Sequence, residues 1–164
     1  MAAAECWRHI SNDREIEAMK TAIVYYSQHH GNARKLLDAI TEKNEVTLID
    51  VVRDKDADIS EYDRIGFASG IYISNFAKQI LEYAETVLPQ GKDVFYIATC
   101  GANPTDSFFK GIRNITDEKG CKFLGQYICT GYDTFGPFKL VGGLKKGHPD
   151  ADEILGAVKF YESL

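Results

Sequence analysis

One stretch constrains the fold of this chain more than any other, because a strand pattern in it passes directly into a helix pattern. Residues 22–26 are all apolar or aromatic, which predicts a strand buried on both faces of a sheet. The spacing of Leu36, Leu37 and Ile40 then predicts one buried face of a helix. Small and polar residues connect the two, and Gly31 permits a close turn. Such a connection presents the first amide groups of the helix to solvent, where they can hold a phosphate.

Strand and helix patterns continue to alternate along the rest of the chain. We predict further strands at 45–50, 62–68, 94–98 and 122–129, and helices at about 77–88, 105–119 and 150–164. This alternation favours parallel strands joined by right-handed crossovers. The fold class that we expect is α/β, a three-layer sandwich on a five-stranded parallel sheet in the order 2-1-3-4-5. That order places a ligand crevice between strands 1 and 3, at their C-terminal ends.

Length and composition narrow the class of protein. The 164 residues fit one domain, which we place at 19–164, with residues 1–18 as an appended N-terminal extension. A net charge of -5 gives no basic footprint for nucleic acid or an anionic membrane surface. The chain has no apolar run of roughly 18 residues and no signal-peptide core, so we expect a cytoplasmic protein. The four cysteines have no C-x-x-C or zinc spacing, so we expect no metal.

Three polar segments follow the first, third and fourth predicted strands and should meet at the crevice. The first resembles the phosphate loop of the flavodoxin family, in which a strand is followed by a hydroxyl residue, a short polar run, Gly-Asn and a threonine. The matching residues are Ser27, Gln28, His29, His30, Gly31 and Asn32, with Ala33 in place of the threonine. The resemblance implies FMN as the cofactor, with its phosphate held here. The alternative is a plain connecting turn.

His29 and His30 also allow a different interpretation of this loop. Histidines are common metal ligands, but adjacent histidines in a loop diverge, and no third ligand stands at a suitable spacing. We therefore favour roles for them as donors to an anion or as exposed bystanders.

The second segment, 69–75, lies along the flavin ring in the family that the chain resembles. The resemblance makes Ile71 and Tyr72 candidates for stacking on the ring, and Ser69 and Gly70 candidates for contacts with the ring edge or the ribityl chain. A flat apolar ring needs an apolar or aromatic face beside it, which these side chains would supply. The alternative is a loop whose Tyr72 only packs on the surface.

The third segment, Thr99, Cys100, Gly101 and Ala102, looks like the other flavin loop of the family, whose backbone N–H groups bond the pyrimidine edge of the ring. Cys100 could instead be a redox-active thiol, although a single cysteine at a strand end is more often a packed residue. No aromatic residue occurs in 99–107 to cover the outer face of the ring. The long loop after the fifth strand could supply one, Tyr132 or Phe135, or could pack on the sheet.

The resemblance implies an FMN-binding redox protein that transfers electrons between partners, either a redox partner protein or a small-molecule acceptor. Because the 99–107 segment has no aromatic residue to cover the ring, an alternative is an NAD(P)H-dependent oxidoreductase that acts on a quinone or another small acceptor. A third possibility is a non-redox binding module on the same scaffold. Other doubly wound folds fit poorly, because the chain has neither G-x-G-x-x-G nor G-x-x-x-x-G-K-[ST].

Overall fold

The computed structural model describes residues 18–134 and 136–164, so the expected N-terminal extension lies outside it except for Ala18. The strands are β1 (Thr21–Tyr26), β2 (Thr47–Asp50), β3 (Arg64–Tyr72), β4 (Asn75–Phe76), β5 (Asp93–Cys100) and β6 (Lys122–Thr130). The helices are α1 (Asn32–Thr41), α2 (Lys78–Thr86), α3 (Lys110–Glu118) and α4 (Ala151–Glu162). There are also two short 3-10 helices. The first, η1 (Asp106–Phe109), precedes α3, and the second, η2 (Gly136–Val141), lies in the loop before α4.

The sheet confirms the expected α/β class and strand order. Its hydrogen-bonded neighbours run β2-β1-β3-β5-β6, and every one of these pairings is parallel. Counted without β4, this is the order 2-1-3-4-5. The difference is β4, which adds a two-residue strand antiparallel to the end of β3.

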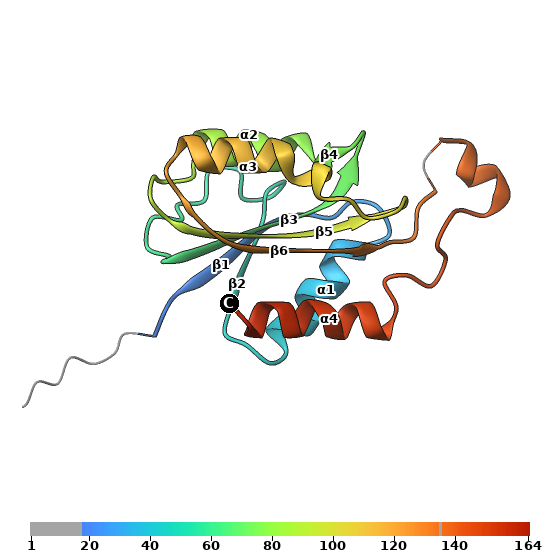
Figure 1. The fold of residues 1–164 in the computed structure, drawn as a ribbon, viewed down its shortest axis with the longest axis horizontal. Coiled ribbons are helices and arrows are strands. Elements are labelled where there is room, and N and C mark those ends of the chain that lie inside the picture. Colours follow the sequence, from blue (N-terminus) through green and yellow to red (C-terminus); the bar gives the residue numbers. More distant parts are fainter. Residues whose placement is uncertain (1–17, 135) are drawn as a thin grey trace, which may run out of the picture.

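Helices cover both faces of the sheet and make three layers (Figure 1). The alternation of side chains along β1 explains this arrangement, because a strand points successive residues to opposite faces. Ala22 and Val24 pack in the core beneath α2 and α3, whereas Ile23 and Tyr25 pack in the core shared with α1 and α4. The run of apolar residues in β1 is therefore buried on both sides, as the sequence predicted.

The end of β3 differs from the sequence prediction, which placed residues 69–75 in a loop. The strand continues to Tyr72 and turns back into β4 through Ile73 and Ser74, both with positive φ angles, 49° and 60°. Ser69 fastens this hairpin: its hydroxyl donates to the carbonyl of Gly70 at 2.6 Å and accepts the N–H of Ala77 at 3.0 Å. A β-branched residue at positive φ is uncommon, and Ile73 is also 95% exposed.

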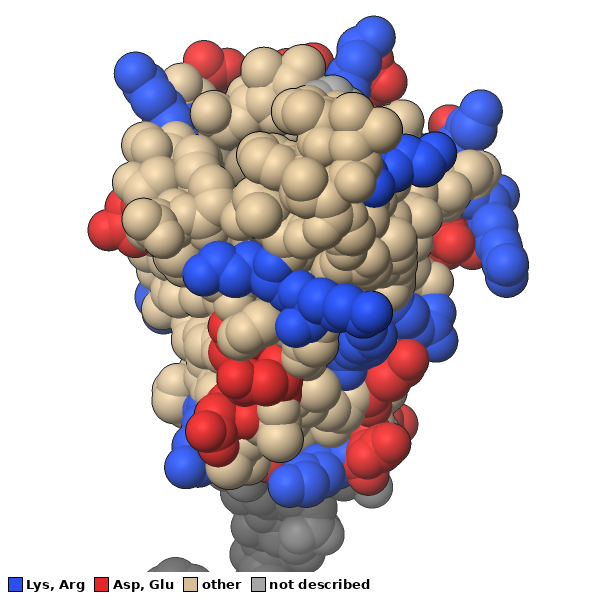
Figure 2. All heavy atoms as spheres, turned by 90° about the vertical axis from the view of Figure 1, so that its right-hand side faces the viewer, with Lys and Arg blue, Asp and Glu red and all other residues tan. Residues whose placement is uncertain are grey.

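The loop between β6 and α4 is partly ordered by its own pairing. Asp133 and Leu144 form an antiparallel bridge at its base, and η2 lies near its tip. The loop projects from the edge of the sandwich where the parallel strands end (Figure 1). Figure 2 shows this end of the molecule: the upper part is largely uncharged, and a band of Lys and Arg side chains lies below it. No helix in residues 18–134 or 136–164 is both long enough and apolar enough to span a membrane.

Candidate functional site

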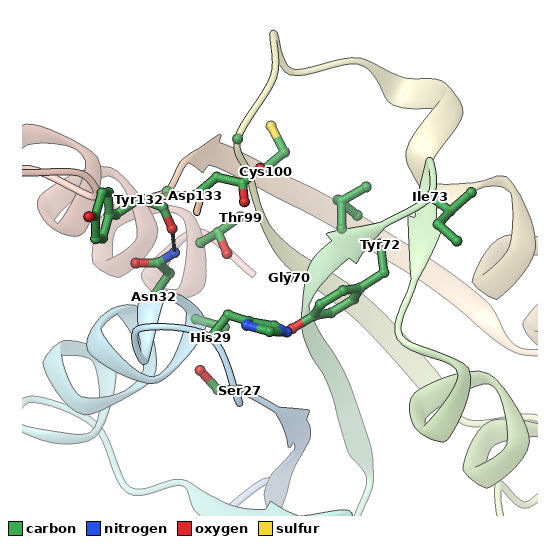
Figure 3. A pocket seen from close by; sticks show the side chains of 14 residues that line it. Ser27, His29, Asn32, Gly70, Tyr72, Ile73, Thr99, Cys100, Tyr132 and Asp133 are labelled. Atoms are coloured by element: carbon green, nitrogen blue, oxygen red, sulfur yellow. Dashed lines mark hydrogen bonds between the residues drawn. The ribbon is translucent and has the colours of Figure 1, made fainter. Parts of the chain in front are cut away.

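A cavity of about 260 Å³ lies at the C-terminal ends of β1, β3 and β5 (Figure 3). The structure brings ten of the predicted site residues together in its lining: Ser27, His29, Asn32, Ala33, Gly70, Ile71, Tyr72, Thr99, Cys100 and Gly101. Five others lie nearby in the chain but do not line it: Gln28, His30, Gly31, Ser69 and Ala102. Sequence reasoning did not assign Ile73, Gly131 and Asp133 to the site, and it considered Tyr132 only as a possible ring cover.

The N-terminus of α1 forms one end of the cavity. Gly31 occupies the N-cap position with a left-handed backbone, φ 63°, and no side chain caps the helix there. The first turn contains no acidic residue. The hydroxyl of Ser27 accepts the N–H of Arg34 at 3.2 Å, and the carbonyl of His29 accepts the N–H of Asn32 at 3.5 Å, so two amides of this turn have partners within the loop. The helix terminus therefore keeps a positive partial charge and backbone donors that suit an anion.

The start of α1 is joined to the segment that follows β6. Asn32, only 8% exposed, donates from Nδ2 to the carbonyl of Tyr132 at 2.8 Å. Gly131 makes this approach possible, because a Cβ at that position would stand 2.8 Å from Nδ2 of Asn32 and 3.2 Å from Cβ of Thr99. Residues after β6 therefore form a wall of the cavity. The glycine at 131 is the signal in the sequence that could have indicated this close approach.

His30 supports this wall from outside the cavity. Its Nε2 lies 2.8 Å from Oγ1 of Thr134, and its ring centroid lies 4.3 Å from that of Tyr132. Both contacts fall on residues that follow β6, so His30 clamps the first loop to this segment. His29, by contrast, faces the cavity and lies 5.5 Å from the ring of Tyr72.

The end of β3 supplies an apolar and aromatic wall. The ring of Tyr72 lies over Gly70, since a Cβ at Gly70 would stand 3.3 Å from the tyrosine hydroxyl oxygen. Tyr72 points across the cavity toward His29 (Figure 3), and Ile71 and Ile73 extend the apolar surface. Burial, with smaller contributions from Tyr26 and Asp133, raises the pKa of Tyr72 to about 12. The phenol is therefore neutral at physiological pH and does not repel an anionic ligand.

The end of β5 brings Cys100 to the cavity as a packed thiol. Cys100 is 4% exposed, and its Sγ donates to the carbonyl of Ala102 at 3.2 Å. Burial raises the pKa of this thiol to about 11. Because the thiolate is the reactive form of cysteine, this environment argues against Cys100 as a redox nucleophile.

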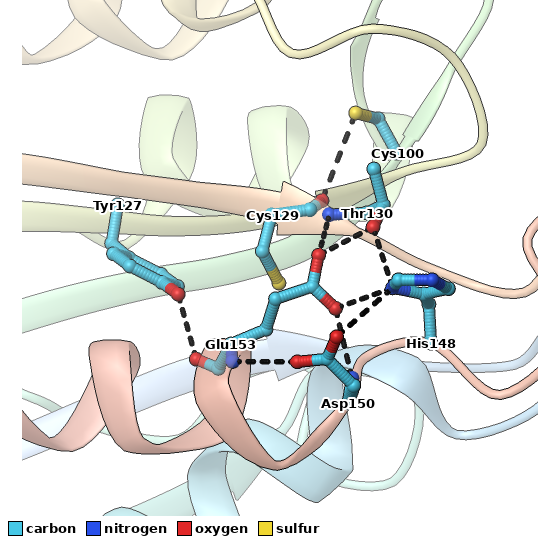
Figure 4. A network of polar contacts seen from close by, with 7 residues as sticks. All are labelled: Cys100, Tyr127, Cys129, Thr130, His148, Asp150 and Glu153. Atoms are coloured by element: carbon cyan, nitrogen blue, oxygen red, sulfur yellow. Dashed lines mark hydrogen bonds and ion pairs between the residues drawn. The ribbon is translucent and has the colours of Figure 1, made fainter.

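A polar network fixes the junction of β6 and α4 behind the cavity (Figure 4). Glu153 accepts from the N–H and hydroxyl of Thr130, from the N–H of Asp150 at 2.8 Å, and from His148 at 2.7 Å. Burial alone would raise the pKa of Glu153, but these hydrogen bonds outweigh it and lower the pKa to about 2. Potential ligand atoms of His148, Asp150 and Glu153 lie within 4.8 Å of one another. The bonds between Asp150 and Glu153 form a capping box of α4, and His148 bonds to the same Glu153 carboxylate, so we assign the group a structural role.

The fold and the cavity agree with a comparison against known protein families. The family model of the flavodoxin domain matches residues 22–133, from β1 to Asp133 in the cavity wall. The chain belongs to the flavodoxin family. An uncharacterized protein of Methanocaldococcus jannaschii is 36% identical over 147 residues, which cover 89% of this chain and 98% of that protein. Membership of the family implies a flavin cofactor.

Solved structures show the same flavodoxin fold at low sequence identity. Oxidised flavodoxin 1 from Bacillus cereus matches with a TM-score of 0.60 and 15% identity, covering 88% of this chain and 99% of that one. An NADPH-quinone reductase of P. pentosaceus matches with a TM-score of 0.61 and 13% identity, covering 87% of this chain and 97% of that one. A flavodoxin and an NADPH-quinone reductase therefore share this scaffold, so the fold alone does not fix a function.

Proposed function

We propose that this flavodoxin-family protein binds FMN in the cavity and transfers electrons between redox partners. The observation that carries the proposal is that one cavity joins a helix N-terminus without acidic side chains to an apolar and aromatic wall. FMN combines a phosphate dianion with a flat apolar ring, and it needs both surfaces at once.

Each part of the cavity has a role in this proposal. The backbone N–H groups of residues 27–33 hold the phosphate, and Ile71 and Tyr72 pack beside the ring. The backbone at Thr99–Ala102 supplies donors to the polar edge of the ring. Bound FMN contributes the redox chemistry, whereas these residues bind it, orient it and exclude water from one side. A cavity of about 260 Å³ lies just below the usual range of ~300–1,000 Å³, so part of a ligand as large as FMN would stay outside it and remain accessible to a partner.

The surface beside the cavity favours a partner protein as the electron acceptor or donor. Ile73 lines the cavity and is 95% exposed, and Leu140 and Val141 on the neighbouring loop are 90% and 74% exposed. Exposed apolar side chains at the same end of the molecule as the cavity (Figure 1) are the kind of surface that another protein covers.

An NAD(P)H-dependent oxidoreductase is the second candidate, and the position of Tyr132 favours it. The ring of Tyr132 packs on His30 and lies to one side of the space between the ends of β3 and β5 (Figure 3). Tyr132 therefore does not lie over that space, and a flavin face that Tyr132 leaves uncovered would accept a nicotinamide. The two candidates use the same flavin site and differ in what approaches it.

The test begins with titration of the purified apoprotein with FMN and with riboflavin, followed by the visible spectrum. We expect FMN to bind at least tenfold more tightly than riboflavin, because riboflavin lacks the phosphate that α1 holds. Stopped-flow spectroscopy then follows the bleaching of the flavin colour by NADPH. Bleaching that needs an added reductase supports the electron carrier, whereas bleaching by NADPH alone supports the oxidoreductase. If neither flavin binds, the proposal is wrong and a non-redox binding role takes its place.

A further inference from the structure

The carboxylate of Asp133 occupies a defined position over the end of β5 (Figure 3). A Cβ built at Gly101 would stand 2.3 Å from Oδ2 of Asp133 and 2.5 Å from its Cβ. Any side chain at position 101 would therefore displace Asp133, and the glycine is what lets the carboxylate reach the backbone of β5. Both residues line the cavity.

A reciprocal pair of backbone hydrogen bonds with Leu144 holds Asp133 in this position. Its N–H donates to the carbonyl of Leu144 at 2.9 Å, and the N–H of Leu144 donates back at 2.6 Å. The preceding residues are also anchored, since Tyr132 donates to the carbonyl of His148 at 3.1 Å and Gly131 donates to that of Cys100 at 2.9 Å. The carboxylate is thus presented to the cavity by a braced segment.

The cavity around this carboxylate has an unequal supply of donors and acceptors. The N-terminus of α1 offers N–H donors, whereas the wall at Ile71, Tyr72 and Ile73 is mainly apolar. The negative charge of Asp133 also acts on Tyr72, where it is a minor cause of the raised pKa of the phenol. An ionised carboxylate only accepts hydrogen bonds, so it suits a ligand group that donates one.

We propose that Asp133 is a specificity-determining residue of the flavin site, whose carboxylate accepts a hydrogen bond from the imide N–H of the ring. This inference rests on the proposed function. An imide edge presents a carbonyl, an N–H and a second carbonyl in a row. Backbone N–H groups at the end of β5 can serve a carbonyl, but the N–H between the carbonyls needs an acceptor. Asp133 supplies that acceptor and selects against rings that lack the imide proton.

The experiment compares FMN with an FMN analogue methylated on the imide nitrogen, each titrated into apoprotein and followed by flavin fluorescence. The wild type should bind FMN roughly tenfold or more tightly than the methylated analogue, because a hydrogen bond to a charged acceptor is lost. In Asp133→Ala the two ligands should bind within about threefold of each other. Gly101→Ala should show the same loss of discrimination, since its methyl group displaces the carboxylate without removing it.

Asp56→Ala is the matched control, because it removes an exposed acidic residue that does not line the cavity. It should keep the wild-type discrimination. Should Asp133→Ala and Gly101→Ala both discriminate as the wild type does, the assignment of Asp133 is wrong while FMN binding stands. If the wild type binds neither ligand, the proposed function itself fails, and the role of Asp133 is rejected with it.

Discussion

Asn32 at the start of α1 donates a 2.8 Å hydrogen bond to the carbonyl of Tyr132, a residue 100 positions later in the chain. The bond joins the helix N-terminus to the opposite wall of the cavity. It also fixes the orientation of the amide, whose buried Oδ1 has no hydrogen-bond partner among the described residues. The loop after β1 and the cavity wall after β6 therefore stabilise each other.

Replacing Asn32 tests both the bond and the phosphate site. Asn32→Ala should cost about 1–3 kcal/mol of stability, because the carbonyl of Tyr132 loses its donor. Asn32→Asp should bind FMN at least tenfold more weakly than Asn32→Ala, because a carboxylate would face the phosphate dianion. Urea unfolding and FMN titration measure the two effects. Equal FMN affinity in the two variants would contradict the assignment of the loop.

The clamp made by His30 can be separated from the cavity itself. His30→Ala should increase amide hydrogen exchange in residues 131–144 by several fold, because contacts with Tyr132 and Thr134 are lost. The matched control is His29→Ala, whose ring contacts Tyr72, and it should leave exchange in this segment unchanged. Hydrogen exchange with mass spectrometry reports both variants. The same increase in both would show that the clamp is not specific to His30.

The depressed pKa of Glu153 predicts a dependence of stability on pH. The native pKa is about 2 and the ordinary value is 4.5, so the carboxylate stabilises the fold above about pH 4.5. That contribution declines as the pH falls from about 4.5 toward 2, and it amounts to at most about 3 kcal/mol. Glu153→Gln should remove it. Urea unfolding at pH 7 and pH 3 should show a difference between wild type and variant that shrinks at pH 3; a constant difference would refute this.

The buried thiols should resist alkylation in the native protein. Burial raises the pKa of Cys100 to about 11 and that of Cys129 to about 12, so about one Cys100 thiol in a thousand is ionised at pH 8. Peptide mapping after iodoacetamide treatment should show both cysteines modified far more slowly than in urea. Rapid modification of Cys100 in the native protein would revive its interpretation as a reactive thiol.

The sequence predicted those parts of the site that depend on local patterns. The apolar run of β1, the spacing of Leu36 and Leu37, and the polar connection between them are neighbours in the chain, so periodicity reveals them. The strand order followed from the alternation of strands and helices. These features place the cavity at the correct edge of the sheet.

Two parts of the site could not be predicted from local patterns. The β3–β4 hairpin turns at Ile73 and Ser74, which are not the Asn-Gly or Asp-Gly pair that marks such a turn. The wall at Gly131 and Asp133 is built by contacts with Asn32 and Gly101, which lie far away in the sequence. Periodicity carries no information about such pairs, and the glycines alone do not reveal their partners.

The exposed loop after β6 and the wall of the cavity have a common base at the bridge between Asp133 and Leu144. The backbone that carries the Asp133 carboxylate is therefore the same backbone that closes the exposed loop. The inner wall of the site and the outer surface at this end of the molecule are parts of one hydrogen-bonded segment.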